Sequence, residues 1–435
     1  MVTWLADASA GAAAPTAGQL TDTLLMLVSA SMVMLIVPGV ALFYGGMSGR
    51  AGAAQAFRAA LSGTAVVVVL AVAGGYGLIA GPALIPHVLG MPDWGLASLL
   101  GGLGPHGLAD ADPYPLARAG YLVALCAVAV AILGAAVASR VTLRAWVVFV
   151  GVWSLLVLFP ACYAVFALSD GWAVAGMNVV DFGGALPVSL AAGSGAAGVI
   201  LACGRRGHPP TGIHSLPLVA TGGSLIWFGW FGLTVGSEGA VDAFSSLIWI
   251  NTLIASAGGA LTWIIVDRVM LRRPTITSAL CGAVSGLVAI APASGVVTTG
   301  WSLLLGALAA LACATMVDLA ARARFGVPMA ICVIHIVASL VGLFYIGLFS
   351  SGGGLIESGN FDLFVSQAVA GITVAAGSFF LSLLVAVALR YTIGLTRVRY
   401  PSDDAEPDEI PARRGEPVPA ESDRAGDPAG GRAGP

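Results

Sequence analysis

The chain is 435 residues long, and 58% of its residues are hydrophobic while only 9% are charged. Since about a quarter of the residues of a soluble domain are charged, this composition excludes an ordinary soluble globular protein and indicates a chain that folds within a lipid bilayer. The formal net charge of −3 says little about partners, and nothing in the sequence indicates nucleic acid as one of them.

Apolar segments of about 20 residues, the length that crosses a hydrocarbon core, recur between short polar or Gly/Pro-rich connections. Alternating strand patterns are absent, and lipid leaves only helices or closed barrels as spanning structures. We therefore expect an all-α polytopic membrane protein with about eleven transmembrane helices. The expected spans are residues 23–46, 61–85, 117–138, 143–166, 184–203, 216–236, 242–268, 276–292, 299–321, 328–349 and 364–390.

The two ends of the chain are expected to lie outside this membrane domain, which is predicted over residues 23–390. Residues 1–22 are rich in Ala and Gly and lack both the basic region and the compact apolar core of a signal peptide. They predict a short external N-terminus. Residues 391–435 become rich in Pro, Gly and both charges without apolar periodicity, which predicts a disordered cytoplasmic tail.

Arginine placement predicts the orientation. With eleven alternating spans, Arg118 is the one arginine among 19 that falls opposite all the others, and the sequence contains no lysine. Because basic residues favour the cytoplasmic side, we expect an external N-terminus and a cytoplasmic C-terminus in the plasma (inner) membrane. The external connections carry acidic residues, which would raise the local concentration of small cations. These residues are Asp93, Asp110, Asp112, Asp170, Asp181, Glu238, Asp242, Glu357 and Asp362.

One histidine, His335, lies inside an expected span, in the apolar stretch 326–343. An ionisable group in hydrocarbon costs on the order of 3 kcal/mol or more unless it faces a cavity or a partner, so His335 is a candidate functional residue. The alternative is a neutral structural histidine that is hydrogen-bonded between helices. Close helix packing is predicted separately by the GxxxG pair Gly282 and Gly286.

No enzyme motif is visible. The sequence shows no phosphate-binding loop, no nucleophile with a plausible base and no metal-ligand cluster. The six cysteines are scattered through apolar segments and are interpreted as small buried hydrophobic residues. We therefore expect a protein that is not an enzyme and that needs neither a cofactor nor a metal.

Several segments together resemble the ammonium transporter and Rhesus-protein family, over residues 22 to about 349. They read DTLLMLVSASMVMLIVPGVALFYGG, WVVFVGVWSLLVLFP, DFGGALPVSLAAGSGAAG, LIWFGWFGLTVGS, INTLIASAGGALTW and RRPTITSALCGAVSGLVAIAPASG. The resemblance implies eleven helices, in which two inverted five-helix repeats are followed by a final helix. It also implies a homotrimer with one pore in each subunit, and a function as an ammonium or ammonia channel.

The resemblance also implies roles for single residues. In the family, aromatic rings and a serine recruit ammonium at an outer vestibule, where it loses a proton before it passes as a neutral species through an apolar channel. Cation–π attraction, about 0.5 to 2 kcal/mol, gives this recruitment a physical basis. The matching residues here are Ser237, Tyr121 and Phe166, the last standing where the family usually has tryptophan. Asp181 matches an aspartate that supports the vestibule from behind, and a helix N-cap is the alternative interpretation.

The chain departs from the family along the channel. Leu125 and Leu233 stand where two phenylalanines usually form the gate, so the gate stays apolar but loses its ring faces. Ser189 occupies the position of the first channel histidine, and His335 matches the second; both are expected to line the pore. Imidazole exchanges protons near neutrality, whereas a serine hydroxyl cannot readily store a proton. A relay between two imidazoles is therefore unavailable, and we expect proton handling to be changed.

These departures leave three functions open. The first is an ammonium or ammonia channel, the second a non-conducting ammonium sensor, and the third a channel for another small neutral gas or monovalent cation. Regulation by a cytoplasmic signal protein is doubtful, because the acidic cluster usual before the second channel histidine is replaced by FGVPMAIC.

Overall fold

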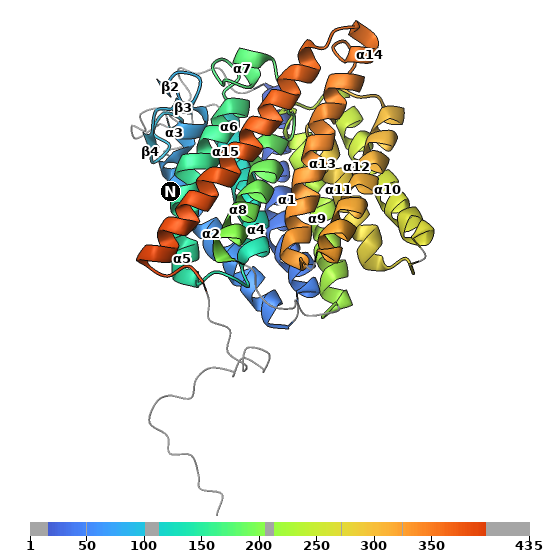
Figure 1. Ribbon diagram of the computed structural model, residues 1–435. Helices are drawn as coiled ribbons and strands as arrows, with labels where there is room; N and C mark the ends of the chain where they lie inside the picture. Colours follow the sequence, from blue (N-terminus) through green and yellow to red (C-terminus); the bar gives the residue numbers. More distant parts are fainter. Residues whose placement is uncertain are drawn as a thin grey trace, which may run out of the picture. The chain divides into compact units, whose positions relative to one another are not determined.

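The structure, a computed structural model, describes residues 16–48, 50–100, 113–204, 213–270, 272–323 and 325–396. These residues form a bundle of long helices with a few short strands at one end (Figure 1). The predicted tail falls almost wholly on residues 397–435, which lie outside the described residues. Most of the predicted external N-terminus, residues 1–15, lies outside them as well.

Within the described residues, ten helical segments are long and apolar enough to cross a membrane. In the first half these are α1 (Ala17–Met47), α2 (Arg50–Val72), α4 (Pro113–Val137), α5–η2–α6 (Leu143–Trp153, Ser154–Leu158, Phe159–Phe166) and η3–α8 (Leu186–Leu190, Ala191–Cys203). In the second half they are α9 (Leu216–Gly236), α10 (Ala243–Val269), α12 (Thr299–Arg322), α13 (Val327–Phe349) and α15 (Asp362–Thr392).

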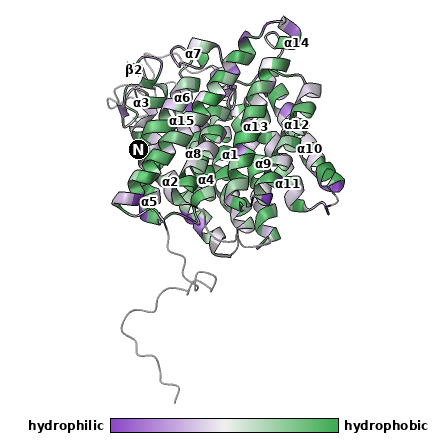
Figure 2. Ribbon diagram, viewed as in Figure 1, coloured by the Kyte–Doolittle hydropathy of each residue, from purple (hydrophilic) through white to green (hydrophobic). Residues whose placement is uncertain are grey.

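The remaining expected span is the shorter apolar helix α11 (Ile276–Ile290), which has 15 residues. Two helices of four residues each, α7 (Val174–Met177) and α14 (Leu355–Ser358), lie in connecting segments. Apolar residues run along the lengths of the long helices, and hydrophilic residues gather toward their ends (Figure 2). The all-α polytopic membrane fold predicted from the sequence is confirmed.

The second span was predicted at the wrong place. The helix α2 ends at Val72, and residues 73–85 of the expected span form β1 (Ala73–Gly74), α3 (Gly75–Ala80) and β2 (Ala83–Ile85). Gly74 has a φ of 123°, which an L side chain rarely adopts, and this conformation interrupts the helix. The sequence remains apolar after this glycine, so the span predicted from composition ended too late. The strands β3 (Leu89–Gly90) and β4 (Asp93–Trp94) pair antiparallel with β2 and β1.

This strand-containing segment is attached to the turn that follows α6. The backbone N–H of His87 donates a 2.8 Å hydrogen bond to Asp170 Oδ2, and Tyr163 Oη donates another of 2.8 Å to the same oxygen. These two hydrogen bonds hold the pKa of the Asp170 carboxyl below its usual range, because they stabilise the charged form. The segment is therefore fixed beside the end of α6.

Contacts among the first five spans recur among the next five. In the first group α1 packs on α4, α2 on α4 and α5, and α4 on α8; in the second α9 packs on α11, α10 on α11 and α12, and α11 on α13. The first helices of the two groups, α1 and α9, pack on each other, and so do the last, α8 and α13. This correspondence agrees with two five-helix units related by a two-fold axis. An odd number of crossings in each unit makes the second unit inverted.

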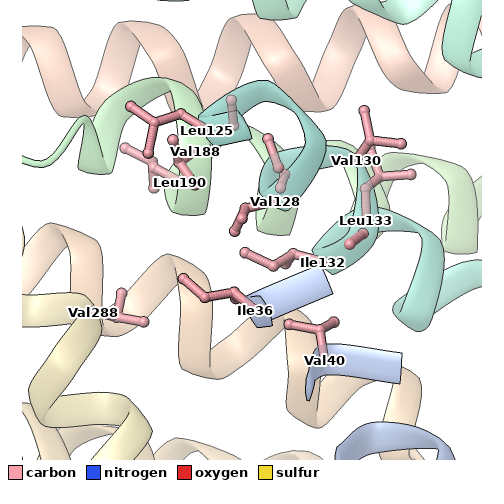
Figure 3. Packing of buried hydrophobic residues seen from close by; sticks show 14 of the residues in the cluster. Ile36, Val40, Leu125, Val128, Val130, Ile132, Leu133, Val188, Leu190 and Val288 are labelled. Atoms are coloured by element: carbon pink, nitrogen blue, oxygen red, sulfur yellow. The ribbon is translucent and has the colours of Figure 1, made fainter. Parts of the chain in front are cut away.

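Two features of the interior position the site. The spans α4 and η3–α8 are the most enclosed, with 89% of the most apolar window buried in each, and their side chains pack together around Leu125, Val128 and Val188 (Figure 3). The GxxxG pair Gly282 and Gly286 allows close packing, because a Cβ at Gly282 would collide with the backbone oxygen of Gly259 in α10. The predicted close approach at this pair is therefore present.

Candidate functional site

Of the three predicted vestibule residues, Tyr121 and Ser237 are in contact, and Phe166 is linked to α4 through Arg118. Tyr121 lies in the first half of α4, Phe166 is the last residue of α6, and Ser237 caps the C-terminus of α9. Tyr121 is buried, whereas Phe166 and Ser237 are partly exposed. A buried hydroxyl, a partly exposed serine and a partly exposed ring thus come from three different helices, and side chains of α4 contact the other two.

A compact hydroxyl network joins α4 to α9. Tyr121 Oη donates a hydrogen bond to the carbonyl oxygen of Leu233, and Ser237 Oγ donates to the same oxygen at 2.8 Å. The two hydroxyl oxygens are 2.9 Å apart. Gly236 permits this approach, since a Cβ there would be 2.6 Å from Tyr121 Cε2. Each hydroxyl can donate its hydrogen to the Leu233 carbonyl oxygen, and a serine that donates there keeps its lone pairs as a hydrogen-bond acceptor.

The Phe166 ring is positioned by the loop that precedes η3. Gly184 in that loop has a φ of 67°, and a Cβ there would be 2.6 Å from the ring atom Cζ of Phe166. The Phe166 carbonyl oxygen lies 3.5 Å from Nη2 of Arg118 in α4. The ring therefore rests on a glycine backbone, and its carbonyl faces a positive charge.

Asp181 is buried behind this ring. Its carboxylate accepts the backbone N–H of Ala185 at 2.7 Å and that of Leu186 at 2.8 Å, at the start of η3. Burial raises the pKa of Asp181 to about 7, while these backbone hydrogen bonds act in the opposite direction. The geometry makes Asp181 a cap for the first turn of the fifth span, and no contact with a solute is needed to account for it.

The two leucines of the predicted gate lie deeper. Leu125 is 0% exposed and Leu233 is 1% exposed. Leu125 of α4 lies beside Val188 of η3 (Figure 3). Leu233 packs over the loop at Gly183, where a Cβ would be 2.9 Å from Leu233 Cδ2. An apolar layer therefore lies below the vestibule.

Ser189 is carried on a π-helical turn. The five residues of η3 continue directly into α8, and Ser189 is 2% exposed. A π-turn is rare, shifts side chains relative to a regular helix and often occurs at functional sites. One turn further on, a Cβ at Gly193 would lie 3.1 Å from His335 Cβ and 3.2 Å from the Cys332 carbonyl oxygen. Ser189 and His335 therefore belong to two helices that touch.

His335 has one satisfied and one unsatisfied ring nitrogen. Its Nε2 shares a 3.1 Å hydrogen bond with Tyr44 Oη of α1, and which atom donates depends on the tautomer. Nδ1 has no hydrogen-bond partner among the described residues, and neither has Ser339 Oγ one turn along α13. Since His335 is only 1% exposed, an interhelical hydrogen bond accounts for half of its polar capacity and leaves Nδ1 available.

The sequence interpretation missed three residues at this site. Tyr44 was missed although it places a hydroxyl in an apolar span, which was the available signal. Trp230 in α9 is buried, and its Nε1 has no hydrogen-bond partner among the described residues. Arg118 was noticed for its side of the membrane but not for its contact with Phe166.

The described part of the chain offers no candidate ligand set for a metal ion. It contains no group of three or more His, Cys, Asp or Glu side chains that could hold an ion. The chemistry that the assembled residues offer is hydrogen bonding and cation–π attraction at one end, followed by an apolar layer and a buried imidazole.

Comparison with known proteins gives consistent matches over most of the chain. Residues 24–411 match the Ammonium Transporter Family. An ammonium transporter of Mycobacterium bovis is 32% identical over 408 residues, covering 86% of this chain and 85% of the relative. The crystal structure of Candida albicans Mep2 superposes with a TM-score of 0.76 at 25% identity, covering 86% of this chain and 85% of that one. A sensor Amt protein superposes with a TM-score of 0.79 at 21% identity, covering 88% and 96%; at that identity the likeness concerns the fold alone.

Proposed function

Because the chain belongs to the ammonium transporter family, we propose that it is a membrane channel for ammonium or ammonia. It recruits ammonium at a vestibule of Ser237, Tyr121 and Phe166 and passes it through an apolar pore lined by Ser189 and His335. The observation that carries this proposal is the hydroxyl network, in which Tyr121 Oη and Ser237 Oγ both contact the Leu233 carbonyl oxygen.

Ammonium carries only N–H donors, so a vestibule for it needs acceptors. Ser237 Oγ offers lone pairs because its own hydrogen is already donated inward. The Phe166 ring, which is partly exposed, supplies a face for cation–π attraction, worth about 0.5 to 2 kcal/mol. An acceptor and a ring face together hold a small cation without fully removing its hydration.

The apolar layer then favours a neutral solute. Leu125 and Leu233 offer no hydrogen bonds, and an ion in such surroundings loses its hydration without compensation. Ammonium therefore gives up a proton to the external water at the vestibule, and ammonia passes the two leucines. Beyond this layer, His335 Nδ1 offers either a donor or an acceptor, and ammonia can match either tautomer because it both donates and accepts. The Ser189 hydroxyl, on the adjoining helix, is a second partner.

The chain's setting in the cell is proposed on the same basis. It resides in the plasma (inner) membrane with its N-terminus external and its C-terminus cytoplasmic, as the arginine distribution predicts. It assembles as a homotrimer with a pore in each subunit, as the family resemblance implies. Regulation by a cytoplasmic signal protein is not part of the proposal.

The test is flux through purified protein in liposomes. Under an inward ammonium gradient we expect uptake of labelled methylammonium. A current measured under the same gradient shows whether net charge crosses the membrane. Ser237→Ala should raise KM several-fold, because the acceptor is lost. Ser224→Ala is the matched control: Ser224 lies in the same helix, is exposed and donates only to Ala220 O, so KM should not change. Folded protein without uptake or current would refute the proposal.

A channel for another small solute is the second candidate, and Leu125, Leu233 and Ser189 motivate it because all three alter the filter. Ammonium and potassium currents should be compared in the same liposomes, first with the natural chain and then with Ser189→His. Potassium conduction equal to that of ammonium would favour this second candidate. A non-conducting sensor would instead bind methylammonium without flux.

A further inference from the structure

Arg118 lies on the face of α4 that meets the C-terminal end of α9. Residues Tyr114, Arg118 and Tyr121 are spaced by four and three, which places them on one face of a helix. Tyr121 shares a 2.9 Å hydroxyl contact with Ser237. Tyr114 Oη lies so close to Gly239 that a Cβ there would collide with it. Arg118 is therefore bracketed by two contacts with the turn that carries Ser237.

Glu238 lies on the other side of the same junction, between Ser237 and Gly239. Its backbone N–H donates to the Val235 carbonyl at 3.2 Å, and Gly239 follows with a φ of 74°. The turn thus closes tightly over the end of α9 and holds Glu238 next to the serine. Glu238 is partly buried, as is Arg118, whose Nη2 is 3.5 Å from the Phe166 carbonyl oxygen.

From this placement we propose that Arg118 and Glu238 set the affinity of the vestibule for monovalent cations in opposite directions. Glu238 attracts the cation beside Ser237, and Arg118 repels it beside Phe166 and Tyr121. This inference rests on the proposed function, and it adds two charged residues that tune the affinity of the vestibule for the cation.

Elementary electrostatics gives the size of the effect. Two unit charges near a protein surface interact appreciably within the Debye length, about 10 Å at 0.1 M salt. Removal of one fixed charge next to the site should change cation affinity about threefold to tenfold at low ionic strength. The change should shrink at 0.5 M NaCl, since the Debye length falls to about 3 Å near 1 M salt.

The test measures binding and flux with the same set of full-length variants. Equilibrium binding of labelled methylammonium to detergent-solubilised protein gives Kd, and liposome uptake gives KM and kcat. We expect Glu238→Gln to raise Kd and KM about threefold to tenfold and Arg118→Gln to lower them by a similar factor. The double variant should lie close to the natural chain.

Two further variants separate charge from shape. Arg118→Lys keeps the charge but loses the planar guanidinium, so its Kd should stay near that of the natural chain. Asp362→Asn removes one negative charge from an exposed residue that begins α15, and it should leave Kd unchanged.

Three results would overturn the inference. These are an unchanged Kd in both single variants, shifts of Kd in the same direction, and an Arg118→Lys value equal to that of Arg118→Gln. Flux without these Kd shifts would defeat this inference alone. Binding with the expected shifts but without flux would defeat the proposed channel alone.

Discussion

His335 differs from a satisfied core histidine in one atom. Tyr44 engages Nε2, and Nδ1 is left without a partner among the described residues although the ring is buried. A buried nitrogen without a hydrogen bond costs about 1 to 3 kcal/mol unless something binds it. The proposed solute is such a partner, and Tyr44 keeps the ring oriented toward it.

Tyr44→Phe should therefore impair transport and stability together. Its loss leaves both ring nitrogens unsatisfied, so we expect about 1 to 3 kcal/mol of lost stability and a several-fold fall in the kcat of methylammonium uptake. The measurements are thermal unfolding and liposome uptake.

His335→Ala should abolish whatever selectivity remains between ammonium and potassium. Unchanged flux and selectivity in this variant would contradict the pore assignment.

Tyr345, which lies in α13 with His335, provides the control for Tyr44 of α1. Tyr345 Oη donates a 2.8 Å hydrogen bond to the Trp301 carbonyl, so Tyr345→Phe also removes one buried hydroxyl contact. We expect a loss of stability without the change in kcat. Equal effects of the two variants on kcat would mean that Tyr44 acts through stability alone.

The vestibule should depend on pH through Glu238. Burial raises the pKa of Glu238, and Asp242 on the same turn raises it further. From α4, Tyr114 packs against the neighbouring Gly239. Because the pKa is raised, the carboxylate becomes neutral earlier on acidification than an ordinary glutamate. Attraction of the cation is present at neutral pH and is lost as pH falls.

The expected result is a rising KM for methylammonium as the external pH is lowered from about 7 to about 5, the range just above an ordinary carboxyl pKa. Methylammonium remains protonated over this range, so the solute itself does not change. In Glu238→Gln this change of KM should be smaller, and any part that persists reports another group, such as Asp181 with its pKa of about 7. An identical pH profile in the two proteins would exclude Glu238 as the titrating group.

Among the elements, η3–α8 is packed closely on several sides by neighbouring helices. It starts as a π-turn capped by Asp181, touches α13 at Gly193, and lies against α15 and α5 at Gly195. A Cβ at Gly195 would be 2.8 Å from Ser382 Oγ, 3.0 Å from Ser378 Oγ and 3.0 Å from Trp153 Nε1. Small residues here let the helix that carries Ser189 pack among three neighbours.

Gly195→Ala should accordingly destabilise the protein. The added methyl group requires the side chains of Ser382, Ser378 or Trp153 to move, or α8 to shift from α15, and overpacking of this kind costs about 1 to 3 kcal/mol. Gly377→Ala in α15 is the control, because a Cβ at Gly377 meets nothing within 4 Å; it should be neutral or slightly stabilising. Thermal unfolding of the two variants measures the difference, and a neutral Gly195→Ala would contradict the packing described.

Considered as a whole, the membrane domain was predictable because its signals are local. Each span needs a sufficient apolar length, and nearly every expected span matches a helix within a few residues. The exceptions have physical reasons. Thr16 and Gln19 form a capping box, which starts α1 before its apolar run begins. Gly74 interrupts the helix of the second span although the sequence stays apolar beyond it. Loop composition yielded the predicted orientation, which remains to be tested.

The site divides in the same way. The family resemblance nominated Ser237, Tyr121, Phe166 and Ser189, since each lies in a segment that resembles a family block, whereas His335 was also singled out by its position in an apolar span. Contacts between distant segments could not be read from such patterns. Tyr44 and His335 are 291 positions apart, and Arg118 of α4 contacts the carbonyl oxygen of Phe166 in α6.

Local chain chemistry thus decided the number of helices, their apolar character and the family to which the chain belongs. Only the packing of the helices decided that Tyr44 engages Nε2 of His335 and that Tyr121 and Ser237 share the Leu233 carbonyl oxygen. It also decided that Arg118 lies beside the Phe166 carbonyl oxygen. The reason is physical: apolar length and charge act on each segment separately, whereas a hydrogen bond needs two groups within about 3 Å, which the folding of the whole bundle brings about.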